Sequence, residues 1–358
     1  MRNFRVLSIV DLYVLTLMAA LTGCSSTQTS SPSASALPSS ALPALGRDEI
    51  RLTFLGTGSP RPSIQRSGPA ILVEAGSHRF LVDAGPGAVG QMLRSVGWEP
   101  LVNIDLALIT HLHFDHTEEI PNLFLTGWLY GRKTPFTLYG PKGTEAMAAA
   151  FESAYTWDIG MRGLSGVPLT AGHIVAHDIT PGVIINQDGL VVTAFHVAHM
   201  PVNPKTYVPY SYWGDTLGYR IDYKGHSVVF SGDTRTLLDS AIAQESVGVD
   251  VLIHEVQIPT LGDSAEAQRA NLSLCVHSSP EEAGKLFAQT KPSLAVYSHI
   301  IPPETTGQQL AELTRPFYSG DLITAEDFMT ITIGDKVTIG ESRGFGIQSF
   351  TDLNGATK

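Results

Sequence analysis

Four side chains of the types that bind metal ions fall within six residues of the chain. They directly follow the apolar stretch 105–110, which is predicted to be a strand: His111, His113, Asp115 and His116. Side chains two positions apart on an extended segment point to the same side, so His111 and His113 are expected to face together. The spacing favours a two-metal site over a merely histidine-rich loop. Two ions about 3.5–4 Å apart can share an activated water, which is the chemistry of hydrolysis.

The motif and several other segments together resemble one known family. The pattern H-x-H-x-D-H at 111–116 resembles the hallmark of the metallo-β-lactamase-fold hydrolases. Further segments fit that superfamily in the expected order, namely 52–60, 80–85, 231–234 and 297–299. Others resemble ribonuclease Z and its arylsulfatase-like relatives: 195–204, 218–221, 253–255 and His277. The resemblance spans residues 50 to about 300 and implies a single α/β domain, a four-layer αββα sandwich.

The resemblance also implies a set of seven ligands for two divalent ions. Three histidines would bind the first ion, an aspartate and two histidines the second, and one aspartate would bridge them: His111, His113 and His199; Asp115, His116 and His299; Asp233. Zinc suits imidazoles and carboxylates best, although ligand type alone leaves manganese and iron open.

The histidine that follows the strand predicted over 190–195 is ambiguous. His196 and His199 both lie near the expected position, and alternation would place them on opposite faces of an extended segment. The Pro-Val-x-Pro run after His199 resembles the relatives better, so His199 is the favoured ligand. His196 is then expected to be a core or supporting histidine.

Three further side chains are candidates for supporting or catalytic roles. Asp83 ends the strand predicted over 79–82, and ligating imidazoles usually donate their second N–H to such a carboxylate. A turn or helix-capping aspartate is the alternative. His254 and His277 would, by the resemblance, act with Asp115 as catalytic residues by assisting proton transfer to the leaving group. Hydrogen-bonded packing is the alternative for both histidines.

The charge balance bears on the substrate. Lys and Arg number 23 and Asp and Glu 34, which gives a net charge of −11 and argues against binding a phosphate backbone. Residues 158–190 contain one Arg and no Lys, unlike the RNA-gripping arm of ribonuclease Z. We therefore expect an arylsulfatase-like hydrolase of a small sulfate or phosphate ester, with nucleic acid an unexpected partner. The alternatives are a phosphodiesterase of ribonuclease Z type, a lactonase and a non-catalytic binding lipoprotein.

The first fifty residues resemble a targeting signal followed by a tether. Two arginines, an apolar run over 6–20 and the sequence Leu-Thr-Gly-Cys24 resemble a bacterial lipoprotein signal. A transmembrane anchor is disfavoured because the run is short and interrupted by Asp11. We expect a signal peptide at 1–23, lipidation of Cys24 and a flexible Ser/Pro/Ala tether at 24–48. The hydrolase domain, 49–358, would then be exported and anchored to a membrane; the oligomeric state, a homodimer included, stays open.

The body of the chain mixes strands and helices from end to end. Strands are predicted at 50–55, 70–73, 79–82, 105–110, 190–195, 217–222, 227–230, 249–254 and 294–298. Helices are predicted at 144–155, 236–244, 280–289 and 306–314, and a terminal hairpin at 328–339. Residues 158–182, which are rich in glycine and contain two prolines, are expected to be irregular.

Overall fold

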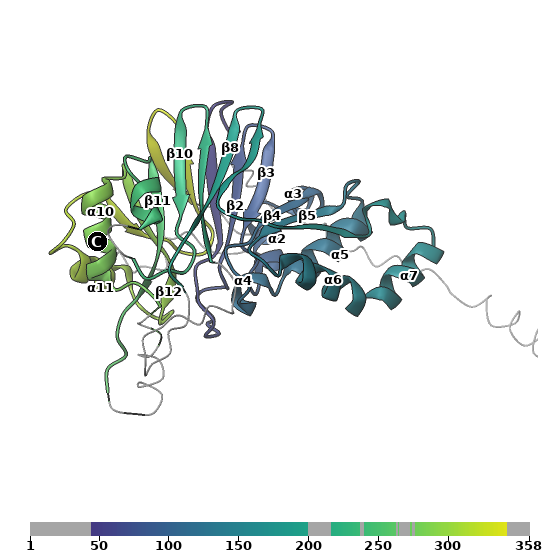
Figure 1. Ribbon diagram of the computed structural model, residues 1–358, viewed down its shortest axis with the longest axis horizontal. Helices are drawn as coiled ribbons and strands as arrows, with labels where there is room; N and C mark the ends of the chain where they lie inside the picture. The colour runs from purple at the N-terminus through teal and green to yellow at the C-terminus, as the bar shows by residue number, and fades with distance from the viewer. Residues whose placement is uncertain are drawn as a thin grey trace, which may run out of the picture. The chain divides into compact units, whose positions relative to one another are not determined.

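Two β-sheets lie face to face, and helices cover the outer side of each sheet (Figure 1). The computed structural model describes residues 44–199, 216–236, 240–262, 264, 273 and 276–341. The expected signal peptide, Cys24 and most of the expected tether lie outside the described residues. Among the helices of the described residues, none is long and apolar enough to cross a membrane.

The first sheet has eight strands in the order β15-β14-β1-β2-β3-β4-β5-β6. From β3 to β6 neighbouring strands are parallel, and the other neighbouring pairs are antiparallel. Their bounds are β1 Ile50–Gly56, β2 Ala70–Ala75, β3 His78–Val82, β4 Leu106–Leu108, β5 Phe136–Gly140, β6 Ile174–Asp178, β14 Met329–Ile333 and β15 Val337–Glu341.

The second sheet has seven strands in the order β13-β12-β11-β10-β9-β8-β7. The run from β10 to β13 is parallel, whereas β7, β8, β9 and β10 pair antiparallel. The bounds are β7 Gly182–Gln187, β8 Leu190–His196, β9 Leu217–Tyr223, β10 His226–Phe230, β11 Val251–Gln257, β12 Leu294–Ile301 and β13 Leu322–Thr324.

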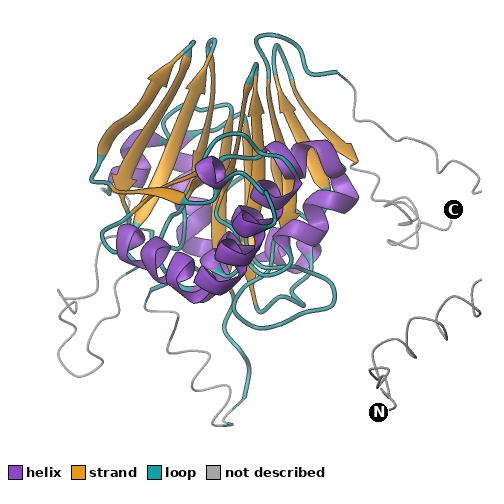
Figure 2. Cartoon of the chain, turned by 90° about the vertical axis from the view of Figure 1, so that its right-hand side faces the viewer, coloured by secondary structure: helices purple, strands orange, loops and turns teal. Residues whose placement is uncertain are grey.

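The helices fall into two groups that flank the sheets (Figures 1 and 2). The group beside the first sheet comprises α2 Ala88–Ser95, α3 Trp98–Asn103, α4 Phe114–Thr117, α5 Ile120–Tyr130, α6 Thr144–Ala154 and α7 Thr156–Leu164. The group beside the second sheet comprises α8 Ala241–Glu245, α10 Pro280–Thr290 and α11 Gly307–Thr314. Helix α10 begins where its sequence signals predict: Ser279 caps it in a capping box with Glu282, and Pro280 occupies the first turn.

Three hydrophobic clusters separate the four layers. One lies between the two sheets, one between the first sheet and its helices, and one between the second sheet and its helices. Strand β1 shows how one apolar run serves two clusters: Leu52 and Phe54 pack between the sheets, while Leu55 packs toward the helices. Near-continuous apolar strands of this kind are typical of sheets buried on both faces. The predicted α/β fold with two sheets between helices is confirmed.

The local predictions fail where tertiary contacts decide the structure. Residues 158–182 were expected to be irregular, but they contain most of α7 and the edge strand β6. Helix α7 has two interior glycines and no buried residue, so its sequence carries a weak helix signal. The helix expected over 236–244 is observed as α8 from Ala241 onward, and residues 237–239 lie outside the described residues.

Arg132 joins α5 to the segment that leads into β5. The side chain is only 4% exposed, and its guanidinium donates to the carbonyl oxygens of Thr134 (3.0 Å), Leu123 (3.3 Å) and Phe124 (3.0 Å). It also lies 5.2 Å from the ring centroid of Phe136. Burial lowers the pKa of Arg132 to about 10, so the group still carries its charge at neutral pH.

We predict that Arg132→Met lowers the free energy of unfolding by about 3 kcal/mol, because it leaves buried carbonyl oxygens without donors. Urea unfolding would measure the change. Lys133→Met, at the exposed neighbouring position, is the control and should change stability by less than about 0.5 kcal/mol. Equal midpoints for the two variants would contradict the role given to Arg132.

Candidate metal centre

The candidate ligands meet at one end of the two sheets, although they are far apart in the sequence. The carboxyl ends of neighbouring parallel strands lie at the same sheet edge, which gathers the residues that follow them. Asp83 follows β3, the motif follows β4, and Asp233 follows β10, while His299 lies near the end of β12. His199 follows β8 after a short connection. Both sheets therefore contribute to the cluster.

The short helix α4 turns two motif side chains inward. His113 is its N-cap residue, and Asp115 and His116 form its first turn. The backbone oxygen of His113 accepts hydrogen bonds from the His116 backbone N (3.1 Å) and from Thr117 Oγ1 (3.0 Å). Asp115 and His116 are each only 1% exposed. The turn expected after the motif strand is thus the element that presents the second pair of donors.

A first group of donor atoms comprises three histidines and an aspartate: His111, His113, His199 and Asp233. Their ligand atoms all lie within 4.8 Å of one another. His111 Nε2 is 2.9 Å from His113 Nδ1, and His199 Nε2 is 3.4 Å from the same atom. Asp233 Oδ2 is 3.7 Å from both His111 Nε2 and His199 Nε2.

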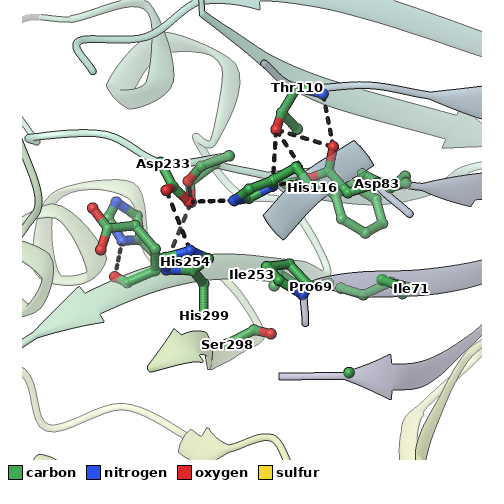
Figure 3. A pocket seen from close by; sticks show the side chains of 17 residues that line it. Pro69, Ile71, Asp83, Thr110, His116, Asp233, Ile253, His254, Ser298 and His299 are labelled. Carbon is green, nitrogen blue, oxygen red and sulfur yellow. Dashed lines mark hydrogen bonds and ion pairs between the residues drawn. The ribbon is translucent and has the colours of Figure 1, made fainter. Parts of the chain in front are cut away.

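A second group lies directly beside the first and comprises Asp115, His116 and His299. Asp115 Oδ2 is 3.5 Å from His116 Nε2 and 3.4 Å from His299 Nε2. Asp233 contacts this group too: its Oδ1 is 3.4 Å from His116 Nε2 and its Oδ2 is 3.2 Å from His299 Nε2 (Figure 3). Asp233 is therefore the side chain within reach of both groups.

Several buried polar atoms of the cluster have no hydrogen-bond partner among the described residues, and they could bind divalent cations. Asp115 Oδ1, His116 Nε2 and Asp233 Oδ1 are buried and have no hydrogen-bond partner among the described residues. Leaving such atoms unpaired is costly, whereas a cation bound between them would satisfy all three. Imidazole nitrogens and carboxylate oxygens are also the donor types that zinc and similar ions take. The donor set therefore suits a pair of divalent ions.

The charges around the cluster favour a cation as well. Burial raises the pKa of Asp233, but His299 and His116 outweigh burial and hold that pKa well below its usual range. Burial lowers the pKa of His199 to about 4, so its imidazole is neutral at pH 7. Burial and the neighbouring His116 likewise hold the pKa of His111 well below its usual range. His116 differs: burial lowers its pKa, but Asp233, Asp83 and Asp115 outweigh burial and raise it well above its usual range. Because metal ions bind ionised carboxylates and neutral imidazoles, an ion would have to displace a proton from this ring.

Asp83 lies behind the second group and contacts His116 from the far side of the ring. Asp83 Oδ2 is 2.8 Å from His116 Nδ1, which leaves Nε2 to face Asp233 (Figure 3). Thr110 secures the carboxylate, because its backbone N donates to Asp83 Oδ1 (2.8 Å) and its hydroxyl to Oδ2 (2.9 Å). Such a carboxylate orients an imidazole and raises its basicity. Sequence reasoning did not identify Thr110, although it stands directly before His111.

His277 forms a third candidate donor group with Asp233 and His299, and it is also paired with Glu255. Its Nδ1 is 3.2 Å from Glu255 Oε2, and its ring centroid is 4.7 Å from that of His199. Burial lowers the pKa of His277, but the Glu255 carboxylate outweighs burial and raises it to about 9. Glu255 Oε1 accepts from the backbone N of Thr234 and of Ser278. The sequence pointed to Glu255 only as the partner of His254 in a pair that resembles the phosphodiesterase and sulfatase branch, and its contact with His277 was not foreseen.

His254 is placed differently from His277, although it lines the same cavity as Asp233 and His299. It is fully buried; its Nε2 lies 2.7 Å from Thr236 Oγ1 and its Nδ1 lies 2.6 Å from the backbone oxygen of Glu255. Both ring nitrogens are thus engaged, and the residue belongs to none of the donor groups. This arrangement favours the packing alternative over a direct catalytic role.

Of the two candidate histidines after β8, the structure brings His199 into the cluster. His196 ends β8 with an exposed side chain and belongs to none of the donor groups.

Two further features fix the loops that carry the donors. Gly232, before Asp233, has φ +57°, and a Cβ there would lie 2.6 Å from the Leu217 backbone oxygen. The Tyr219 hydroxyl on β9 donates to the Ile109 backbone oxygen (2.8 Å), which joins the second sheet to the motif strand of the first.

Comparison with known proteins identifies the family. Residues 78–300 match the family model described as beta-lactamase superfamily domain. The ribonuclease Z of Mycobacterium sp. (strain KMS) is 34% identical over 265 residues, which cover 73% of this chain and 87% of the relative. The ribonuclease Z of Mycobacterium bovis (strain BCG / Pasteur 1173P2) is 31% identical over 290 residues, 79% of this chain and 98% of the relative.

Solved structures share the fold. The metallo-beta-lactamase fold protein YhfI from Bacillus subtilis superposes with a TM-score of 0.57 at 19% identity, over 78% of this chain and 98% of its own. Human tRNase Z, short form, superposes with a TM-score of 0.55 at 24% identity, over 79% of this chain and 99% of its own.

The comparisons overturn one expectation from the sequence. Nucleic acid was considered an unlikely partner because the chain is expected to be exported and is acidic, yet the relatives just described are ribonucleases, enzymes named for acting on RNA. Net charge did not predict the substrate class, since a few well-placed cations at a site can outweigh the charge of the remaining surface.

The chain belongs to the β-lactamase superfamily, has ribonucleases Z among its homologues and is a metal-dependent hydrolase.

Proposed function

We propose that the protein is a phosphodiesterase of ribonuclease Z type that cleaves RNA at a centre of two divalent ions. The observation that carries the proposal is Asp233, a buried carboxylate within 3.7 Å of nitrogens from both donor groups. The identity of 34% with a ribonuclease Z supports the substrate class. These relatives favour the phosphodiesterase over the arylsulfatase-like activity first expected from the sequence.

We assign the ligands as the cluster suggests: His111, His113 and His199 for one ion, Asp115, His116 and His299 for the other, and Asp233 for both. Zinc is the metal best matched to this donor set. When bound, two such ions would supply Lewis acidity toward the phosphoryl oxygens and activate a water. Asp83 would keep the His116 ring in its binding orientation.

His277 is the side chain that we assign to proton transfer. Its ion pair with Glu255 stabilises the protonated ring and directs Nδ1 away from the cluster, which leaves Nε2 for the substrate. A protonated imidazole beside the donor groups can donate to the oxygen that leaves when the phosphodiester breaks. Glu255 is itself held by two backbone N–H groups and acts by positioning His277.

We further propose, from the N-terminal sequence, that Cys24 is lipidated after removal of residues 1–23 and that the domain from residue 49 is exported on its tether. Labelling with radioactive palmitate in a bacterial host should mark the wild-type chain and not Cys24→Ser. Cys275→Ser is the control and should keep the label. Label on Cys24→Ser would contradict lipidation at this position.

We predict that Asp233→Asn lowers kcat/KM for RNA by at least about 100-fold and reduces the metal content below the wild-type value of about two equivalents. The reason is that the amide removes the charge within reach of both groups. Inductively coupled plasma mass spectrometry and cleavage assays would measure both effects. Asp158→Asn, at a partly exposed aspartate of α7, is the control and should leave both values unchanged. Full activity and metal content in Asp233→Asn would refute the assignment.

We predict that His277→Ala lowers kcat for RNA by about 10²–10⁴-fold, because the leaving alkoxide loses its proton donor. The loss should be much smaller for bis(p-nitrophenyl) phosphate, whose leaving group needs little protonation. Steady-state assays on both substrates, with metal content measured in parallel, would test this. Equal losses on the two substrates would point to a damaged metal centre instead of a missing acid.

A further inference from the structure

Arg235 lies on the loop that carries Asp233. It stands two residues after Asp233, and its backbone N donates to the backbone oxygen of Ala198 (2.8 Å), directly before His199. The loop that carries the carboxylate shared by both donor groups is thereby joined to the loop that carries one of the histidines. The side chain of Arg235 is 47% exposed, whereas Asp233 and His199 are buried.

Glu282 holds the guanidinium in place. Arg235 Nε lies 3.1 Å from Glu282 Oε1. The other carboxylate oxygen, Oε2, accepts from the backbone N (3.0 Å) and hydroxyl (3.1 Å) of Ser279, which fixes Glu282 in the capping box of α10. Ser279 follows His277 by two residues, so the arginine is held next to the segment that carries the proposed proton donor. Arg235 is thus a half-exposed cation whose backbone and partner are both fixed.

Two other guanidinium groups, which are more deeply buried, donate their hydrogen bonds to backbone oxygens of the protein. Arg66 donates to the backbone oxygens of Pro303 and Ala325, and Arg132 donates to three carbonyl oxygens beneath α5. Among the described residues Arg235 instead has one carboxylate partner at the surface, and exposed pairs of this kind contribute only about 0–1 kcal/mol. A phosphate could therefore replace Glu282 at little cost, and the planar guanidinium binds phosphate well.

We propose that Arg235 binds the phosphate next to the scissile phosphodiester, so that the centre selects substrates with successive phosphates over isolated esters. The proposal rests on the proposed RNA-cleaving function and specifies its substrate class. Glu282 acts as the resident partner that the incoming phosphate displaces. Local placement of a cation would explain how a chain of net charge −11 engages a polyanion.

Binding of a fluorescein-labelled 2′-O-methyl RNA of about ten nucleotides, measured by anisotropy with metal-loaded protein, tests the proposal without requiring cleavage. Arg235→Gln should raise Kd about tenfold at low salt, as expected for loss of one charge-assisted contact. The slope of log K against log salt should fall by about 0.7, the value for one phosphate contact on a single strand. Arg235→Lys should recover most of the affinity, and Glu282→Gln, which can still cap α10, should tighten binding.

Arg162→Gln is the matched control, because Arg162 on α7 is 41% exposed and paired with Asp158 much as Arg235 is with Glu282. It should leave Kd and the salt slope unchanged. An equal effect of Arg162→Gln, or an unchanged salt slope in Arg235→Gln, would overturn the proposal. In cleavage assays, Arg235→Gln should lose at least about fivefold more kcat/KM on RNA than on bis(p-nitrophenyl) phosphate. Tight binding of the RNA without its cleavage would refute the proposed function while leaving the role of Arg235 intact.

Discussion

The structure depends on holding two buried carboxylates, Asp115 and Asp233, against a set of imidazoles. Each carboxylate has an oxygen with no hydrogen-bond donor among the described residues. Desolvation of this kind opposes folding unless an opposite charge enters the same space. The histidines hold the pKa of Asp233 well below its usual range in spite of burial, so this carboxylate stays ionised. The same feature that weakens the bare fold is what makes the site attract a metal ion.

The surrounding architecture limits the freedom of these side chains. The donors stand at strand ends and in one short helix, and the connections that carry them are fixed by specific contacts. Thr110 and Asp83 align His116 behind the cluster, and Glu255 holds His277 through its own backbone partners. Side chains that are held in place by fixed partners need to move less during the reaction. Two of these partners, Thr110 and Glu255, belong to none of the donor groups and contact the cluster through Asp83 and His277.

The sequence allowed the motif ligands to be predicted from spacing alone, because His111 and His113 share one side of an extended segment and Asp115 and His116 open a helix. The distant candidates, His199, Asp233 and His299, could be predicted only through the resemblance to a known family, since no local pattern links residues 184 positions apart. Thr110 and Glu255 were missed because their roles arise from three-dimensional contacts. Helix α7 was missed because its two glycines weaken the helix signal and none of its residues is buried. For His254, which the resemblance marked as a candidate, both ring nitrogens contact other groups of the protein, which favours the packing alternative.

The hydrogen bond from the Tyr219 hydroxyl to the Ile109 backbone oxygen has a consequence for how the chain can change over evolution. It joins β9 of one sheet to the strand end of the other, one residue before Thr110. Substitutions in the apolar layer between the sheets would therefore shift one half of the donor cluster relative to the other, without touching any donor. Side chains between the two sheets would therefore influence the affinity for cations. Sequence variation among them would be limited by the distances between the donor atoms as well as by packing.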